Sequence, residues 1–428
     1  MDTTNSASSQ RHGRKRRFNL FRSLGPGLIT GAADDDPSGI ATYSQVGAQF
    51  GYGLGWTMIF SFPLMAVIQG ISAGIGAVTG KGITRNLRHH YPPWVMGAAV
   101  LLLLIANVIN LGADLAAMGA ALQLLIGGPF HLYAIGFAVL CVCLEVFVSY
   151  ARYVMVLKWL TLSLLAYVAV VFIVQVPWAE AAHGALVPQL AFDRDHAMAL
   201  IAILGTTISP YLFFWQAGEE VEELHRRHRA RLSTRPNDAG RELSRIRLDT
   251  LVGMGFSNLI ALFIIIATGA TLHASGVTAI ATSAQAAEAL RPVAGPFAFG
   301  VFAVGIIGTG LLAVPVLAGS AAYAVAELLH VPEGLDRRPK DAKAFYATIA
   351  VATIGSIALS FTELSPIRAL YWSAVVNGIL AVPLMAIMLR MAVNPRIMGE
   401  LTAPRWMIAV GWLTVGVMTL ATVGFFLL

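Results

Sequence analysis

Three consecutive aspartates stand inside an otherwise apolar stretch of this chain. Asp34, Asp35 and Asp36 are the only charged residues between Leu24 and Phe50. They come ten to twelve residues into this stretch, so a helix would carry them roughly 15–18 Å deep, near the middle of a bilayer. A charge there costs about 3 kcal/mol on insertion scales, and such residues usually bind an ion or face a wet cavity. The pattern therefore predicts cation chemistry at mid-membrane.

The residues that follow the aspartates predict a break in the helix. Pro37 lacks a backbone donor and disfavours helix at Asp36, and Gly39 tolerates unusual backbone angles. Asp36 directly precedes the proline and is the first candidate ligand. Neighbouring carboxylates repel unless a cation or proton compensates them. Asp34 and Asp35 are therefore expected either to line a vestibule or to cap the half-helix that follows.

A second apolar stretch, LGTTISPYLFFWQ (204–216), carries a proline at a similar depth. Pro210 is preceded by three hydroxyl side chains, and carbonyls freed at both breaks are expected to converge with the aspartates on a cation. Taken singly, each proline is also compatible with a simple kink in a structural helix. The candidate substrate or metal residues are Asp36, Asp35, Ser209, Thr206, Thr207, Ala33 and Gly39.

Further polar residues inside the apolar stretches are candidates for a pathway. Asn107, Asn110 and Asp114 have the spacing i, i+3 and i+7, which places them on one helical face. They either support a hydrophilic path or hydrogen-bond between helices, and ionisable Asp114 favours the first function. The pathway or coupling candidates are Asp34, Asn107, Asn110, Asp114, Tyr211, Gln216 and Asn377.

The composition is that of a membrane protein. Of 428 residues, 57% are hydrophobic and 12% are charged, about half the charged share that a soluble surface needs. We expect a basic tail at 1–23 and one all-α transmembrane domain at 24–427. No phosphate-binding loop, zinc spacing or nucleophile motif indicates an enzyme, and no resident cofactor is expected. The predicted spans are 24–50, 52–79, 94–126, 131–149, 153–176, 197–221, 250–272, 296–328, 344–361, 367–391 and 405–427.

The distribution of positive charge predicts the orientation. With the N-terminus in the cytoplasm, 26 of the 29 Lys and Arg residues fall in inside segments. The broken first and sixth spans predict two oppositely oriented five-helix repeats, 24–176 and 197–391, followed by an extra helix, 405–427. We expect a monomer in a bacterial-type inner membrane, with the bilayer and a small cation as partners and no nucleic acid. The segment 226–247 is interpreted as a solvated linker. The glutamates at 219–223 either attract cations or, as we favour, pair with Arg226 to Arg231.

Three segments together resemble the Nramp divalent-metal transporters. These are GPGLITGAADDDPSGIATYSQVGAQFGYGLGW from Gly25, NVINLGADLAAMGAALQLLIG (107–127) and LGTTISPYLFFWQA (204–217). The resemblance covers roughly residues 24 to 390. It implies the fold of amino-acid/cation symporters, built from inverted five-helix repeats, with the substrate site between helices 1 and 6.

The chain departs from the family pattern at the positions that carry chemistry. The family's Asp-Pro-Gly-Asn is Asp36-Pro37-Ser38-Gly39 here, and its Met-Pro-His is Ser209-Pro210-Tyr211, so the asparagine, thioether and histidine are absent. One acid of the third-helix pair remains, at Asp114, and the ninth-helix arginine has no counterpart. These losses predict weak or absent proton coupling.

The remaining donors favour a hard cation. Carboxylate, hydroxyl, carbonyl and water suit magnesium, whereas a thioether favours softer ions. A magnesium-transporting branch of the family likewise lacks the thioether. The sequence therefore predicts a secondary transporter or facilitator for a divalent cation, with Mg²⁺ favoured over Mn²⁺. The alternative is an Nramp-like transporter that carries another small or organic solute.

Overall fold

The computed structural model describes residues 26–148, 161–227, 229–335, 337–362 and 364–428. The predicted tail at 1–23 and residues 153–160 of the fifth predicted span lie outside this part. All regular structure in the described residues is helical, as expected for an all-α membrane protein. Nine helices there are long and apolar enough to cross a membrane, so the predicted number of eleven spans is not confirmed.

The first and sixth predicted spans are both broken helices. α2 (Pro26–Asp34) and α3 (Pro37–Phe50) form the first, and α11 (Arg194–Thr207) and α12 (Pro210–Arg226) form the second. In each case the proline is the first residue of the second half-helix, where its missing N–H costs no helical hydrogen bond. The predicted breaks at Pro37 and Pro210 are therefore confirmed.

The two broken helices run in opposite directions. The first turn of α2 donates a backbone N–H to Asp249 of α13 (Pro236–Thr271) at 2.9 Å. The last turns of α12 approach the same part of α13, where Glu220 lies 3.7 Å from Arg245. At the opposite end, the rings of Phe50 on α3 and His196 on α11 are 4.5 Å apart. We call these the arginine end and the far end of the bundle.

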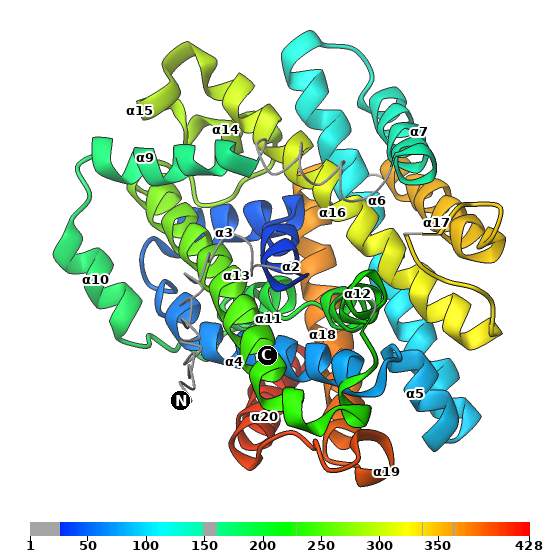
Figure 1. Ribbon diagram of the computed structural model, residues 1–428. Coiled ribbons are helices and arrows are strands. Elements are labelled where there is room, and N and C mark those ends of the chain that lie inside the picture. The colour runs from blue at the N-terminus through cyan, green and yellow to red at the C-terminus, as the bar shows by residue number, and fades with distance from the viewer. Residues whose placement is uncertain (1–25, 149–160, 228, 336, 363) are drawn as a thin grey trace, which may run out of the picture.

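The other helices surround this central set. Figure 1 shows α2, α3, α11 and α12 near the middle of the bundle, α13 running diagonally across it, α9 and α10 at one edge and α7 and α17 at the opposite edge. The long helices are α4 (Trp56–Thr79), α6 (Pro93–Ile126), α7 (Phe130–Phe147), α16 (Ala298–Leu329), α17 (Lys343–Ser356), α18 (Pro366–Ala392) and α20 (Arg405–Leu427). The shorter ones are α5 (Ile83–His90), α9 (Leu165–Ile173), α10 (Trp178–Leu186), α14 (Ser283–Glu288), α15 (Arg291–Ala294) and α19 (Pro395–Met398).

Small residues bring the broken helices close to their neighbours. A Cβ added at Gly31 of α2 would overlap the backbone of Gly253 on α13, and one at Gly205 of α11 would overlap the carbonyl of Ala374 on α18. Membrane helices gain little from hydrophobic burial against each other, so such close contacts contribute much of their association. These contacts hold α2 against α13 and α11 against α18, close to the two breaks.

The interpretation of 226–247 as a solvated linker is wrong for most of its length. α12 continues to Arg226, and α13 already begins at Pro236. Between them lies a short connection with one 3-10 turn, Leu232–Thr234. The charged first part of α13 is helical because its side chains pair along and between helices, for example Arg245 with Glu242 at 2.9 Å.

Candidate functional site

Asp36 lies at the centre of the first break and caps α3. Its backbone is extended, with φ −70° and ψ 171°, as is usual for an N-cap residue. Oδ1 accepts hydrogen bonds from the Gly39 N–H and the Ser38 hydroxyl, both at 2.7 Å. The side chain is buried. Asp36 itself, and neither Asp34 nor Asp35, therefore caps the half-helix.

The second oxygen of Asp36 joins the break to three other helices. Oδ2 accepts from Asn110 Nδ2 on α6 at 3.0 Å and from the Tyr211 hydroxyl on α12 at 3.3 Å. Asn110 is held in turn by the Ser373 hydroxyl of α18, which donates to Asn110 Oδ1 at 2.8 Å. Asp36 is thus the point where α3, α6 and α12 meet, with α18 behind them.

The other two aspartates point toward a different helix. The Ser257 hydroxyl on α13 lies 2.7 Å from Asp34 Oδ2 and 3.0 Å from Asp35 Oδ1. Asp34 Oδ1 has no hydrogen-bond partner among the described residues. The three consecutive carboxylates therefore have different partners, and the hydrogen bond found to the second broken helix is that of Asp36.

The hydroxyls before the second break turn back toward their own helix. Ser209 Oγ donates toward the carbonyls of Gly205 at 2.7 Å and Thr206 at 2.9 Å. Thr207 Oγ1 donates to the carbonyl of Ile203 at 2.9 Å. Thr206 reaches the first break: a Cβ added at Gly39 would lie 3.2 Å from its Oγ1. The structure thus brings Thr206, Gly39 and Asp36 together, while the Ser209 hydroxyl is engaged by carbonyls of its own helix.

The pathway candidates take separate positions. Asn107 donates to the Leu317 carbonyl of α16 at 2.8 Å, an interhelical bond away from Asp36. Gln216 accepts from the Thr30 hydroxyl of α2, one helix turn from the arginine end. Asp114, one turn beyond Asn110 on α6, is buried with neither oxygen hydrogen-bonded among the described residues, and the same holds for Asn377 Nδ2 on α18.

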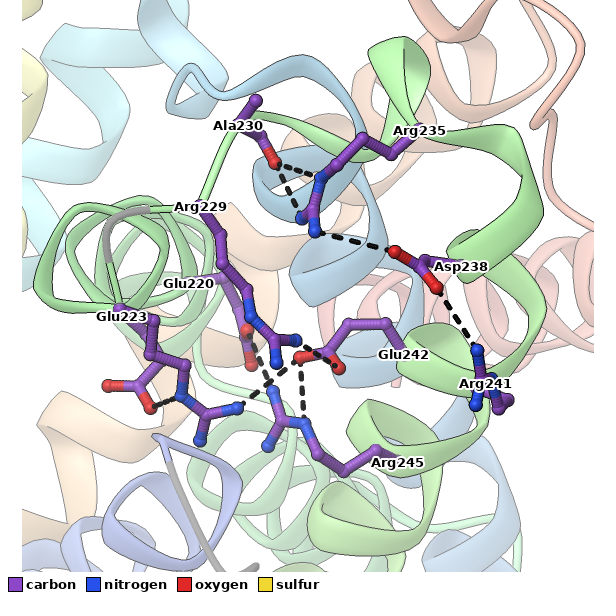
Figure 2. A network of polar contacts seen from close by, with 10 residues as sticks. Glu220, Glu223, Arg229, Ala230, Arg235, Asp238, Arg241, Glu242 and Arg245 are labelled. Atoms are coloured by element: carbon purple, nitrogen blue, oxygen red, sulfur yellow. Dashed lines mark hydrogen bonds and ion pairs between the residues drawn. The ribbon is translucent and has the colours of Figure 1, made fainter. Parts of the chain in front are cut away.

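An ion-pair network closes the arginine end (Figure 2). Glu223 pairs with Arg227, and Glu242 of α13 pairs with Arg229 at 3.5 Å and Arg245 at 2.9 Å. Arg245 also reaches Glu220, whose side chain is only 3% exposed. The expectation that these glutamates pair with Arg226–Arg231 is correct for Glu219, which Arg226 contacts at 3.1 Å, and for Glu223, but Glu220 is paired from α13. The network joins the last turns of α12 to the start of α13.

Two cavities lie at opposite ends of the bundle. The one at the far end has a volume of about 310 Å³ and lies between α3, α11 and α18, with Gln45, Asp195 and Arg368 among its lining residues. The one at the arginine end has about 110 Å³ and is lined by Glu222, Glu327 and other residues. Of these two cavities, the larger one lies at the far end, opposite the ion-pair network.

The break carries two buried carboxylates, Asp35 and Asp36, of which Asp36 is hydrogen-bonded to α6 and α12, and it also offers backbone oxygens. In the part of the chain that the structure describes, no three His, Cys, Asp or Glu side chains gather as a preformed metal centre. A cation at the break would therefore depend on Asp36 and on carbonyls, which are hard oxygen donors. Such a site suits a transported ion better than a permanently held one, because few ligands must be released.

Several residues that complete the site were missed from the sequence. Ser257 and Ser373 contact the aspartates and Asn110, and Asp249 and Arg245 tie the arginine ends of α2 and α12 to α13. A serine within an apolar helix is a common and weak signal, since it often bonds its own backbone. Ser373 lies one turn before Asn377 and therefore on the same face of α18. Because Asn377 was a candidate from the sequence, this face of the helix could have pointed to Ser373.

The chain can now be compared with known proteins. The family model described as "Natural resistance-associated macrophage protein-like" matches residues 27–428. The chain is 26% identical to the divalent metal cation transporter MntH of Klebsiella pneumoniae (strain 342), over 96% of this chain and 94% of the relative. It is 28% identical to MntH of Xanthomonas campestris pv. campestris, over 92% and 88% respectively.

Solved structures support the same fold. A variant of the Eremococcus coleocola manganese transporter matches with a TM-score of 0.76 and 18% identity, over 97% of this chain and 88% of that one. Mhp1, a nucleobase-cation-symport-1 family transporter in a closed conformation, matches with a TM-score of 0.61 and 16% identity, over 95% and 90%. The relatives are named as transporters and not as enzymes, in agreement with the sequence. Since the family model spans nearly the whole chain, this membrane protein belongs to the Nramp family.

Proposed function

We propose that this protein moves a divalent metal cation across the membrane by alternating access, with the substrate site at the breaks of the two central helices. The observation that carries the proposal is the position of Asp36. It is a buried carboxylate at the end of an interrupted helix, and groups from α6 and α12 converge on one of its oxygens. Family membership supports the proposal, because the relatives are named as divalent metal cation transporters.

The donors at the breaks favour Mg²⁺, with Mn²⁺ second. Asp36 offers a carboxylate, and the residues before the prolines offer carbonyl and hydroxyl oxygens, while no sulfur ligand stands at position 209. Hard oxygen donors suit Mg²⁺, which also keeps several of its waters. The small side chains of Gly39 and Ser209 would leave space for such waters once the site opens. Cation and lipid bilayer are then the partners, without a resident cofactor.

The two ends of the bundle fit the two access routes. The far-end cavity approaches the break along α3, where Gln45 lies nine residues beyond Asp36, about 13 Å along a helix. The arginine end is closed by the pairs between α12 and α13. With the N-terminus in the cytoplasm, as the charge distribution predicts, the cavity faces the outside and the ion pairs form the inner closure.

Calorimetry on purified protein tests the proposal. Wild type is titrated with Mg²⁺, Mn²⁺, Ca²⁺ and a panel of amino acids, and Asp36→Ala is compared with Asp35→Ala. We expect Asp36→Ala to abolish divalent binding, because it removes the carboxylate that contacts Tyr211 on α12 and Asn110 on α6. Asp35→Ala, which changes the neighbour that faces Ser257 on α13, is expected to retain it. Divalent binding that survives in Asp36→Ala would place the site elsewhere, and amino-acid binding without divalent binding would favour an organic substrate.

A further inference from the structure

The oxygens freed by the two helix breaks are held by side chains of the protein itself. A proline at position i cannot donate to the carbonyl at i−4, so Pro37 releases the carbonyl of Ala33 and Pro210 releases that of Thr206. The Tyr211 hydroxyl lies 3.2 Å from the Ala33 carbonyl. The Ser209 hydroxyl lies 2.9 Å from the Thr206 carbonyl. Each released carbonyl thus has a hydroxyl within hydrogen-bond distance, although the Ser209 hydroxyl lies closer still to the Gly205 carbonyl, at 2.7 Å.

The two carboxylate oxygens of Asp36 likewise accept hydrogen bonds from the protein itself. These two oxygens together offer about four acceptor positions. Ser38 and the Gly39 N–H occupy Oδ1, and Asn110 and Tyr211 occupy Oδ2. In this buried conformation, a cation can coordinate the carboxylate only by displacing one of these donors.

The four donors are not equally easy to displace. The two on Oδ1 belong to the turn that begins α3 and move with Asp36. The Asn110 amide is fixed from behind by Ser373. Tyr211 makes the longest contact, 3.3 Å, and shares its single proton with the Ala33 carbonyl. It also stands on the other broken helix, directly after Pro210, so a movement of α12 relative to α3 withdraws it.

We propose that the Tyr211 hydroxyl takes the place of the cation on Asp36 and Ala33 while the carrier is empty. This inference rests on the function proposed above. A buried carboxylate without partners is strongly unfavourable, and a carrier that alternates must also close when empty. The hydroxyl compensates the empty site in part and has to leave when the cation binds. Tyr211 therefore weakens cation binding and speeds the return of the empty carrier.

The substitution Tyr211→Phe separates these effects. It removes one oxygen and keeps the ring, so the packing of α12 is preserved, and Tyr211→Leu serves as a second variant if the first fails to fold. Loss of a competing hydrogen bond is expected to raise the affinity for Mg²⁺ or Mn²⁺ about three- to ten-fold. In proteoliposomes, net uptake at saturating cation should fall, while cation-for-cation exchange, which never requires the empty protein to close, should persist.

The control is Tyr167→Phe, which removes a buried hydroxyl from α9, outside the site. It should change neither the affinity nor the ratio of net uptake to exchange. If wild type binds a divalent cation and Tyr211→Phe leaves both quantities unchanged, the inference is wrong while the proposed function stands. A parallel loss of uptake and exchange would show a structural role only, and would also overturn it. Absence of divalent binding in wild type and all variants would remove the proposed function together with this inference.

Discussion

The pair Arg245–Glu220 offers a test of how the arginine end is held closed. We predict that Arg245→Gln increases the fraction of molecules that are open at this end. Without Arg245, the contact that remains for the Glu220 carboxylate among the described side chains is the hydrogen bond from Gln216 Nε2 at 3.4 Å. Its carboxylate then gains free energy by reaching water, which it can do only when α12 moves away from α13.

The expected size follows from burial and distance. Removing one partner of a fully buried ion pair costs about 3–5 kcal/mol, and an exposed pair contributes about 0–1 kcal/mol. Glu220 is 3% exposed, Arg245 is 15% exposed, and their charged atoms are 3.7 Å apart. We therefore place the loss between these limits, at about 2 kcal/mol, which corresponds to about thirty-fold in the ratio of open to closed protein.

The assay is the labelling rate of a cysteine behind the closure. Thr30 on α2 is fully buried, between the arginine end and the break, so Thr30→Cys reacts with a maleimide only after opening. The experiment uses a Cys143→Ser background, because Cys143 is exposed and Cys141 is buried. When closing is fast, the rate follows the open population, and we expect about a thirty-fold increase in Arg245→Gln.

The matched control removes another arginine of the same helix. Arg241 is 87% exposed and pairs with Asp238 at 3.1 Å, so Arg241→Gln should leave the labelling rate nearly unchanged. Adding Glu220→Gln to Arg245→Gln removes the buried charge as well, and should reverse most of the increase. An equal effect of Arg241→Gln, or no effect of Arg245→Gln, would refute the role of this buried pair.

Two further predictions concern selectivity and orientation. Ser209→Met introduces a soft thioether in place of a hydroxyl that is bonded to its own helix. The variant should show a higher preference for Cd²⁺ over Mg²⁺ in a competition titration. A wild type that already strongly prefers Cd²⁺ would contradict the assignment of a hard site. A cysteine introduced at the exposed Ser233, in the connection between α12 and α13, should be unreactive toward an impermeant maleimide added to intact cells, whereas labelling from outside would invert the proposed orientation.

Much of the fold was predictable because the relevant physics is local. Length and hydropathy predicted α4, α6, α7, α16, α18 and α20 to within a few residues, since a bilayer fixes how long an apolar helix must be. Pro37 and Pro210 predicted both breaks because a missing N–H acts within one helix turn. The helical first part of α13 was not predicted, since it is supported by contacts with other helices: an ion pair with Glu220 of α12 and a hydrogen bond with the backbone of Gly27 on α2.

The sequence predicted several residues of the candidate site, but not which helices their side chains contact. Asp36, Asn110, Thr206 and Tyr211 were all singled out, and the structure brings them together around one break. The position before Pro37 ranked Asp36 first, but the sequence could not show which helix Asp34 and Asp35 would face, because three adjacent residues of one type carry no signal about their long-range partners. Their partner is the Ser257 hydroxyl on α13, more than two hundred residues away in the sequence.

The changes from the family pattern gain a common explanation from this geometry. Losing the asparagine and the thioether removes ligands that would hold a cation, and a tyrosine in place of the histidine adds a hydroxyl that competes with it. The Tyr211 hydroxyl lies within hydrogen-bond distance of Asp36 Oδ2 and the Ala33 carbonyl, the two oxygens that the proposed site would use as ligands. Fewer ligands and a built-in competitor both lower affinity, which fits a substrate present at millimolar rather than trace concentration. A hydroxyl that compensates the empty carboxylate also lessens the need for a proton to do so, which is consistent with weak proton coupling.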